Sequence, residues 1–382
     1  MIDINDFEEI RPYRDHEAYD VIQELLKHEE FIQTVDAFLG DDQKEYVNKM
    51  LPQATTIKEF QTYVIAYALA NIIHTTTDGF TVENSERALD GDKHLFISNH
   101  RDIVLDSGLL NFFLNEAEAD TCEIAIGSNL LENPLVRDVV KLNKSFMVTR
   151  GVSARELLMH SKRLSNYIRH QITSGNSSVW LAQREGRAKD GNDTTQSSVL
   201  KMVNLSGGKD LRKNFMDLNV LPFGISYEFI PCAGLKAKET AMKAINKEYV
   251  KGEHEDIISM RQGILGEKGR VHISFGRHIV DFIDEVVTDE GPNRFYDTLI
   301  EAIDREIHAN LRLWPSNYIA LDMVNGDKAH ADKYTDEDVS RFEKYLNEQV
   351  ADSGMERDEI LPHILLLFSN PAVNHLKAVA KK

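Results

Sequence analysis

The sequence predicts an α/β fold, in which a mixed, mostly parallel sheet is flanked by helices, with an N-terminal helical bundle and a helical C-terminal extension. From Lys93 to Phe275, short apolar runs alternate with longer amphipathic ones, which is typical of strands and helices that pack on each other. On both sides of this part, apolar residues recur at helical spacing. We therefore expect an N-terminal helical domain over 1–88, an α/β domain over 89–285, and a helical extension over 286–382 packed on it.

Composition and charge exclude several classes of protein. The chain has 382 residues, of which 42% are hydrophobic and 28% charged, as in ordinary globular proteins. A net charge of -18 argues against nucleic acid as a partner. The two cysteines, Cys122 and Cys232, are too few for a disulfide framework. The start of the chain does not resemble a secretory signal, and no run approaches the roughly 18–20 apolar residues of a membrane span. We expect a cytoplasmic protein.

The N-terminal region is predicted to be a small helical bundle. Apolar residues at helical spacing indicate helices near 19–26, 31–39, 46–51 and 57–73. The stretch 75–79, which contains Asp78-Gly79, ends the bundle. Residues 82–88 fit neither a helix nor a strand pattern clearly.

The middle region supplies the sheet. Strands are predicted at 94–98, 123–126, 145–148, 178–182, 220–225 and 271–275, and helices at 104–114, 134–142, 154–173 and 200–203. Pro222 indicates that its strand lies at an edge or is kinked at its entry. Residues 233–268 are rich in Lys and Glu and are expected to form solvated helices. Further helices are predicted at 295–313, 336–350 and 359–369.

His100 is the first candidate for chemistry. It lies at a strand-to-helix turn, close to Asp102 and Asp106, and the ends of strands in open α/β sheets carry many active sites. A neutral imidazole oriented by a carboxylate accepts a proton from a hydroxyl group. The plainer alternative is a surface histidine beside Asp102 as a helix-capping residue.

A local excess of cations follows His100 along the chain. Between Arg137 and Lys189 there are eleven basic residues and three acidic ones, although the whole chain is acidic. This reversal indicates an anionic ligand. Cations suited to a phosphate are Lys144 before the strand at 145–148, Arg150 after it, and Arg184, Arg187 and Lys189 after the strand at 178–182. Within the second loop, Gly186 permits a tight turn and Glu185 is expected to hold Arg187. The alternative for each cation is a solvated surface residue.

Four blocks in order resemble the glycerolipid acyltransferase superfamily, which includes the glycerol-3-phosphate and 1-acylglycerol-3-phosphate acyltransferases. Asn99-His100 with Asp106 resembles the H-x4-D block of that family. Residues 146–151, 184–187 and 220–227 resemble its second, third and fourth blocks. The resemblance covers roughly residues 90–280. The preceding helical bundle is similar to that of soluble, plastid-type glycerol-3-phosphate acyltransferases, whose third block carries two cations one residue apart, as Arg187 and Lys189 are.

Two positions depart from the family pattern. Five residues separate His100 from Asp106 where the family has four, so either a one-residue bulge keeps Asp106 as the partner or Asp102 takes its role. The continuation Ser107-Gly108-Leu109-Leu110 resembles the family's helix and favours Asp106. Gln183-Arg184 also stands where the family usually has an aromatic-proline pair.

The resemblance implies an enzyme of phospholipid biosynthesis that moves an acyl group from acyl-CoA or acyl-carrier protein to a glycerol-phosphate hydroxyl. It implies His100 as general base, Asp106 as its orienting carboxylate, and no metal or other cofactor. The cations expected to bind phosphate are Arg150, Arg187, Lys189 and Lys144, with Asn99, Arg101, Glu185 and Gly186 in support. Reversible contact with the inner face of a membrane is compatible with the amphiphilic product. Two alternatives stay open: an amine acceptor, as in ornithine-lipid synthesis, and a non-catalytic protein that binds anionic lipid.

Overall fold

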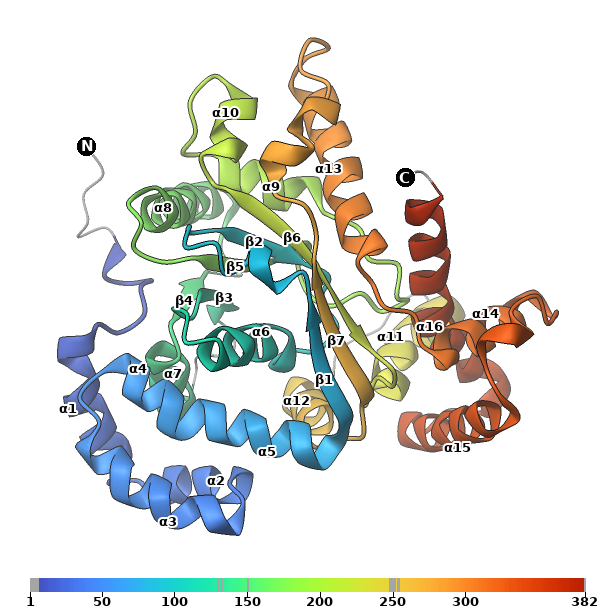
Figure 1. Cartoon of the computed structure of the whole chain (residues 1–382), viewed down its shortest axis with the longest axis horizontal. Helices are drawn as coiled ribbons and strands as arrows, with labels where there is room; N and C mark the ends of the chain where they lie inside the picture. Colours follow the sequence, from blue (N-terminus) through green and yellow to red (C-terminus); the bar gives the residue numbers. More distant parts are fainter. Residues whose placement is uncertain are drawn as a thin grey trace.

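The computed structural model describes residues 7–128, 131, 133–149, 151–246, 252 and 255–380. Within them a seven-stranded sheet has the order β1-β7-β6-β2-β5-β3-β4 (Figure 1). The five strands from β6 to β4 are parallel, whereas β7 is antiparallel to β6 and β1 is parallel to β7. The strands are β1 (Thr77–Glu83), β2 (Leu95–Ser98), β3 (Glu123–Gly127), β4 (Ser145–Val148), β5 (Val179–Ala182), β6 (Val220–Tyr227) and β7 (Gly269–Phe275).

Helices precede, flank and follow the sheet. The N-terminal helices are α1 (Asp15–Leu25), α2 (Glu29–Phe38), α3 (Asp41–Met50), α4 (Ile57–Phe60), a π-helical turn (Gln61–Ala66) and α5 (Tyr67–Thr76). Those inserted between strands are α6 (Leu105–Glu116), α7 (Pro134–Leu142), α8 (Ala154–Thr173), α9 (Ser197–Asn204), α10 (Leu211–Met216), α11 (Ala233–Asn246) and α12 (Glu255–Leu265). After the sheet come α13 (Pro292–Ala309), α14 (Pro315–Asn325), α15 (Asp336–Ser353) and α16 (Arg357–Val379). Short 3-10 helices cover Leu51–Gln53, Ser85–Arg87, Ile279–Asp281, Ile283–Glu285 and Ala331–Lys333.

The two faces of the sheet are covered by different helices, because side chains alternate along each strand. In β2, Leu95 and Ile97 join the core beneath α8, α9 and α13, whereas Phe96 joins the core with α5 and α6 on the opposite face (Figure 1). Separate apolar clusters hold the N-terminal helices together with α7, and α11 together with α14–α16. Among the described residues no helix is both long and apolar enough to cross a bilayer.

The predicted fold class is confirmed, and each of the six predicted strands lies within two residues of an observed one. The sequence missed β1, α10 and α14. β1 is an edge strand with four exposed residues among its seven, so it lacks the apolar run that marks the other strands. It pairs with β7, and the sheet therefore begins at Thr77, within the region that was expected to be helical.

The prediction of an edge position for the strand with Pro222 is wrong, because β6 lies between β7 and β2. The proline is tolerated where β7 has just ended. Its carbonyl accepts a hydrogen bond from the backbone N–H of Gly276, one residue beyond the last residue of β7. Its missing N–H therefore falls outside the regular pairing of the two strands.

The helices expected in 233–268 are present as α11 and α12, but the expectation that they are solvated is wrong for several of their residues. Ala233, Ala237 and Ala241 of α11 are buried in the cluster shared with α15 and α16. Lys236 and Lys268 are almost completely buried. Burial lowers the pKa of both lysines to about 8. The Lys- and Glu-rich composition therefore conceals a packed segment.

Candidate active site

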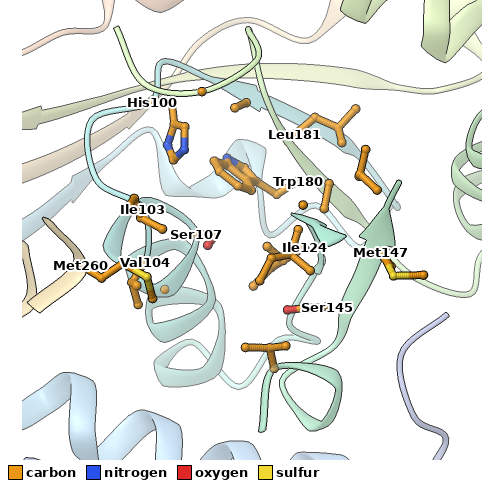
Figure 2. A pocket seen from close by; sticks show the side chains of 18 of the residues that line it. His100, Ile103, Val104, Ser107, Ile124, Ser145, Met147, Trp180, Leu181 and Met260 are labelled. Carbon is orange, nitrogen blue, oxygen red and sulfur yellow. The ribbon is translucent and has the colours of Figure 1, made fainter. Parts of the chain in front are cut away.

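His100 lies in the loop between β2 and α6, at the carboxyl end of the parallel strands. Its Nδ1 is 2.8 Å from Oδ2 of Asp106. Its ring packs edge-on against Trp180 of β5, with 5.7 Å between the ring centroids. Figure 2 shows the imidazole and the indole side by side at the pocket, with Ser107 and Ile124 close to them. With Nδ1 occupied, Nε2 is the nitrogen that remains for a substrate.

Asp106 is fully buried in the first turn of α6 and is surrounded by donors. Besides His100, its Oδ2 accepts the backbone N–H groups of Arg101 at 2.6 Å and Asp102 at 3.0 Å. Its Oδ1 accepts the hydroxyl of Tyr227 in β6 at 2.9 Å. The amino end of a helix also favours a negative charge. These contacts keep the carboxylate fixed behind the imidazole.

Asp102 has a different place. Its Oδ1 accepts the backbone N–H groups of Val104 and Leu105, both at 2.9 Å, and so holds the start of α6. The structure thus pairs His100 with Asp106. The extra residue in the spacing is taken up by the turn that Asp102 closes.

Asn99 and Arg101 fasten the histidine loop on either side of His100. The Asn99 amide bonds both the N–H and the carbonyl of Ile225 in β6, each at 2.9 Å. The Arg101 guanidinium is buried and forms an ion pair with Asp193 at 2.5 Å. The ammonium of Lys236 donates to the Arg101 carbonyl. Arg101 therefore supports the loop from inside the protein.

A cavity of about 1120 Å³ opens beside His100. Part of its wall is apolar and comes from the N-terminal helices through Phe31, Val35, Phe38, Leu69 and Ile72, and from the strands through residues such as Ile124 and Met147 (Figure 2). Another part comes from the loop after β5 and from α11, and carries Arg184, Arg187, Lys189 and Lys243. The cavity thus combines an apolar surface with a cluster of cations.

Two cations of the loop after β5, Arg187 and Lys189, have different partners. Arg187 is nearly buried, and its Nη1 donates to Ser259 Oγ at 2.8 Å and lies 3.5 Å from Cys232 Sγ. Lys189 is 2.9 Å from Glu239, which also pairs with Lys243. Gly186 has φ +68°, a left-handed conformation that glycine adopts without strain. Glu185 also lines the cavity.

Both arginines of the cluster, Arg184 and Arg187, have spare hydrogen-bonding capacity. Arg187 has no carboxylate partner among the described residues. The Nε of Arg184 is buried with no hydrogen-bond partner in the described part of the chain. Buried donors without partners are rare in proteins, and an anionic group in the cavity would satisfy them.

Two sequence candidates remain, Arg150 and Lys144. Arg150 lies outside the described residues. Lys144 precedes β4, at the opposite end of the parallel strands from His100. Its ammonium donates to the Thr121 carbonyl at 3.1 Å, and burial lowers its pKa. Asn143 and Ser145 on either side of it line the cavity, but Lys144 does not, because its ammonium is held at Thr121. Lys144 is therefore not part of the phosphate site.

Sequence reasoning did not assign roles to Tyr227, Ser259 or Asp193. Each lies far from its partner along the chain: Tyr227 is 121 residues from Asp106, and Ser259 is 72 residues from Arg187. Tyr227 lies at the end of the block 220–227, beyond the strand predicted at 220–225, and Ser259 falls in the segment expected to be solvated. No local pattern marks them, since only the tertiary fold brings these pairs together.

Part of the chain matches a known protein family. Residues 79–216 match the family model described as Acyltransferase. No curated protein matches the sequence. Among solved structures, the chain is similar to the 1-acyl-sn-glycerophosphate (LPA) acyltransferase PlsC from Thermotoga maritima, with 14% identity, a TM-score of 0.37, and coverage of 75% of this chain and 93% of that one. The matched residues run from β1 to α10 and include His100, Asp106 and the cationic loop after β5. Residues 79–216 thus form an acyltransferase domain.

Proposed function

We propose that the chain transfers an acyl group from a thioester, acyl-CoA or acyl-carrier protein, to a hydroxyl of glycerol-3-phosphate or 1-acylglycerol-3-phosphate. The observation that carries this proposal is the His100–Asp106 pair on the wall of a cavity that is apolar in one part and cationic in another. A glycerol-phosphate acceptor and an acyl chain need these two surfaces beside one base.

In the proposed reaction, Nε2 of His100 takes the proton of the acceptor hydroxyl as its oxygen attacks the thioester carbonyl. The tetrahedral intermediate collapses with cleavage of the C–S bond, and the imidazolium returns the proton to the thiolate that leaves. Asp106 accepts the hydrogen bond from Nδ1–H throughout and stabilises the imidazolium. General-base assistance of this kind contributes typically about 10²–10⁴-fold to a rate. The substrate supplies the nucleophile, so no acyl-enzyme forms.

The cations would hold the phosphate of the acceptor. Arg187 is held in place by Ser259 and has donors to spare, and the unpartnered Nε of Arg184 lies in the same wall. Lys189 would have to exchange its contact with Glu239 for the phosphate. Fixing the phosphate positions the neighbouring hydroxyl, and positioning is itself a large part of catalysis.

The test is release of free thiol from palmitoyl-CoA in the presence and absence of glycerol-3-phosphate. We expect acceptor-dependent release by the wild type and loss of at least about 10²-fold in His100→Ala. A matched control is His330→Ala, because His330 Nδ1 lies 2.7 Å from Asp322 in a similar pair among the C-terminal helices. Near wild-type turnover by His100→Ala would contradict the mechanism.

The same assay separates the two alternatives. Release that depends on an amino acid, and not on glycerol-3-phosphate or 1-acylglycerol-3-phosphate, would point to an amine acceptor. Binding of anionic lipid without thiol release under any acceptor would point to a binding protein. The cations on the cavity wall favour the phosphate-bearing acceptor.

A further inference from the structure

A second group of chemically reactive side chains lies at the far end of β2 from His100. Asp90 belongs to the loop before β2, His94 immediately precedes β2, and His278 follows β7. One ligand atom from each side chain lies within 4.8 Å of the others. The sequence pattern gave no sign of it, since 184 residues separate the two histidines.

The sheet register explains why these residues meet. Leu95 of β2 pairs with Val220 of β6. On the other side of β6, Phe223 pairs with Phe275, the last residue of β7, and these two strands run in opposite directions. Three residues further, His278 comes level with Val220. His94 and His278 therefore face each other across β6, about two strand spacings of 4.8 Å apart in the backbone. Their ring centroids are 5.3 Å apart.

We propose that Asp90, His94 and His278 bind a divalent transition-metal ion such as Zn²⁺. Two imidazole nitrogens and one carboxylate oxygen, with water in the fourth position, are a donor set that zinc uses. His94 is fully buried and Asp90 is partly exposed, so the site combines a fixed ligand with access for the ion.

The present distances, which involve the two different oxygens of Asp90, suit an ion after small side-chain movements that open the pair with His94 and close the pair with His278. His94 Nε2 is 2.9 Å from Asp90 Oδ1, and His278 Nε2 is 3.7 Å from Asp90 Oδ2. A tetrahedral ion with bonds of about 2.0–2.1 Å places its ligand atoms about 3.3 Å apart. His278 closes this gap by side-chain rotation, because it lies at the start of a short 3-10 helix outside the sheet.

The surroundings of His94 suit a metal ligand. Asn219, which precedes β6, lies 2.9 Å from its Nδ1. Metal-bound histidines generally carry such a partner on the other ring nitrogen. Binding through Nε2 requires the ring proton to move to Nδ1, where the Asn219 amide, turned about its axis, accepts it through Oδ1.

Such an ion would connect the loop before β2 to the end of β7, and so join the parallel and antiparallel parts of the sheet. His94 and His100 are six residues apart along β2, about 20 Å at 3.3 Å per residue. The ion would therefore stabilise the fold without taking part in acyl transfer. Failure of this proposal leaves the proposed function intact, and the converse holds as well.

The experiment is a titration of the chelator-treated full chain with Co²⁺, followed by visible absorption, and then with Zn²⁺. We expect one equivalent of Co²⁺ to give d–d bands, which Zn²⁺ displaces, and Zn²⁺ to raise the unfolding temperature. His278→Ala removes a partly exposed ligand and should weaken binding by more than the roughly 10–100-fold that loss of an outer-shell partner costs. His330→Ala should bind Co²⁺ as tightly as the wild type does, because His330 pairs with Asp322 and is not one of the three proposed ligands.

A second variant tests the outer shell. Asn219→Asp provides a carboxylate for the Nδ1 proton of His94 and should tighten binding, with unchanged stoichiometry. The proposal is overturned if no bands appear at one equivalent, or if His278→Ala binds Co²⁺ as tightly as the wild type. An unfolded Asn219→Asp would not obscure this result, because the comparison of His278→Ala with His330→Ala stands without it.

Discussion

Replacement of Asp106 by Asn tests the proposed chemistry while leaving the shape of the site nearly unchanged. Oδ2 of Asp106 accepts three N–H donors, from His100, Arg101 and Asp102, whereas Oδ1 accepts only the Tyr227 hydroxyl. The Asn carbonyl oxygen must therefore take the Oδ2 position, and its NH₂ group then faces Tyr227. The tyrosine hydroxyl can turn and accept this new donor. The substituted side chain therefore keeps four hydrogen bonds and loses only the negative charge.

The loss of charge determines how far kcat falls. During transfer His100 becomes an imidazolium, and a hydrogen bond between two charged groups is roughly twice as strong as a neutral one. In a Ser-His-Asp triad the same substitution lowers kcat about 10⁴-fold. We expect Asp106→Asn to lower kcat by about 10³–10⁴-fold, which corresponds to about 4–5.5 kcal/mol of activation free energy. The KM for acyl-CoA should change little, because Asp106 is buried behind His100.

Asp102→Asn is the matched control. It changes the neighbouring carboxylate, whose Oδ1 holds the backbone N–H groups at the start of α6. Asn and Asp serve such a capping role about equally well, so turnover should stay within about threefold of the wild type. The assay is thiol release from palmitoyl-CoA with saturating glycerol-3-phosphate. The reasoning is refuted if Asp102→Asn loses as much activity as Asp106→Asn, or if Asp106→Asn keeps more than about a tenth of wild-type turnover.

Three further outcomes are expected. Tyr227→Phe leaves one oxygen of buried Asp106 without its donor, which should cost about 1–3 kcal/mol in urea unfolding and lower kcat. Arg187→Ala should raise the KM for glycerol-3-phosphate or lower kcat/KM, with little change in the KM for acyl-CoA. Burial raises the pKa of Glu123 to about 7 from 4.5, so the folded state holds a proton that the unfolded state releases, and its contribution to stability is lost as pH rises from about 4.5 through 7. Glu123→Gln should therefore gain about 2–3 kcal/mol over the wild type at pH 8 and nothing at pH 4.

Each of these outcomes has a clear opposite. Unchanged stability and turnover in Tyr227→Phe would mean that its hydroxyl does not support Asp106. Acceptor kinetics in Arg187→Ala that equal those of the wild type would remove Arg187 from the phosphate site. A stability difference between Glu123→Gln and the wild type that does not grow from pH 4 to pH 8 would contradict the raised pKa. Thermal or urea unfolding at each pH measures this last quantity.

The sequence predicted the parts of the fold and site that depend on neighbours along the chain. Buried strands such as β4 are short apolar runs, and their bounds followed from residues 145–148 directly. His100 and Asp106 lie in one turn, so their spacing alone suggested that they meet. β1 was not predicted, because about half of it faces solvent and its partner residues in β7 lie 191 or 192 positions further along the chain. Lys144 was misplaced because only the fold shows that its ammonium is held at Thr121.

The segment 233–268 shows most clearly why composition misleads. Its composition indicates a polar, solvated stretch, but three of its residues support the active site. Lys236 donates to the Arg101 carbonyl beside His100, and Ser259 holds the guanidinium of Arg187. Gly263 lies so close to Asp102 that a Cβ there would stand 2.1 Å from the carboxylate oxygen Oδ2.

These three contacts join the histidine loop to the cationic loop through α11 and α12, the two helices of this segment. Lys236 and Ser259 are buried, and Gly263 leaves no room for a side chain, so the segment cannot shift without disturbing both loops. It lies outside residues 79–216, which carry the family match. The base and its carboxylate therefore come from the family domain, whereas the position of Arg187 relative to His100 depends on a segment beyond it. We expect substitutions at Ser259 to change the choice of acceptor before they change the rate of the chemical step.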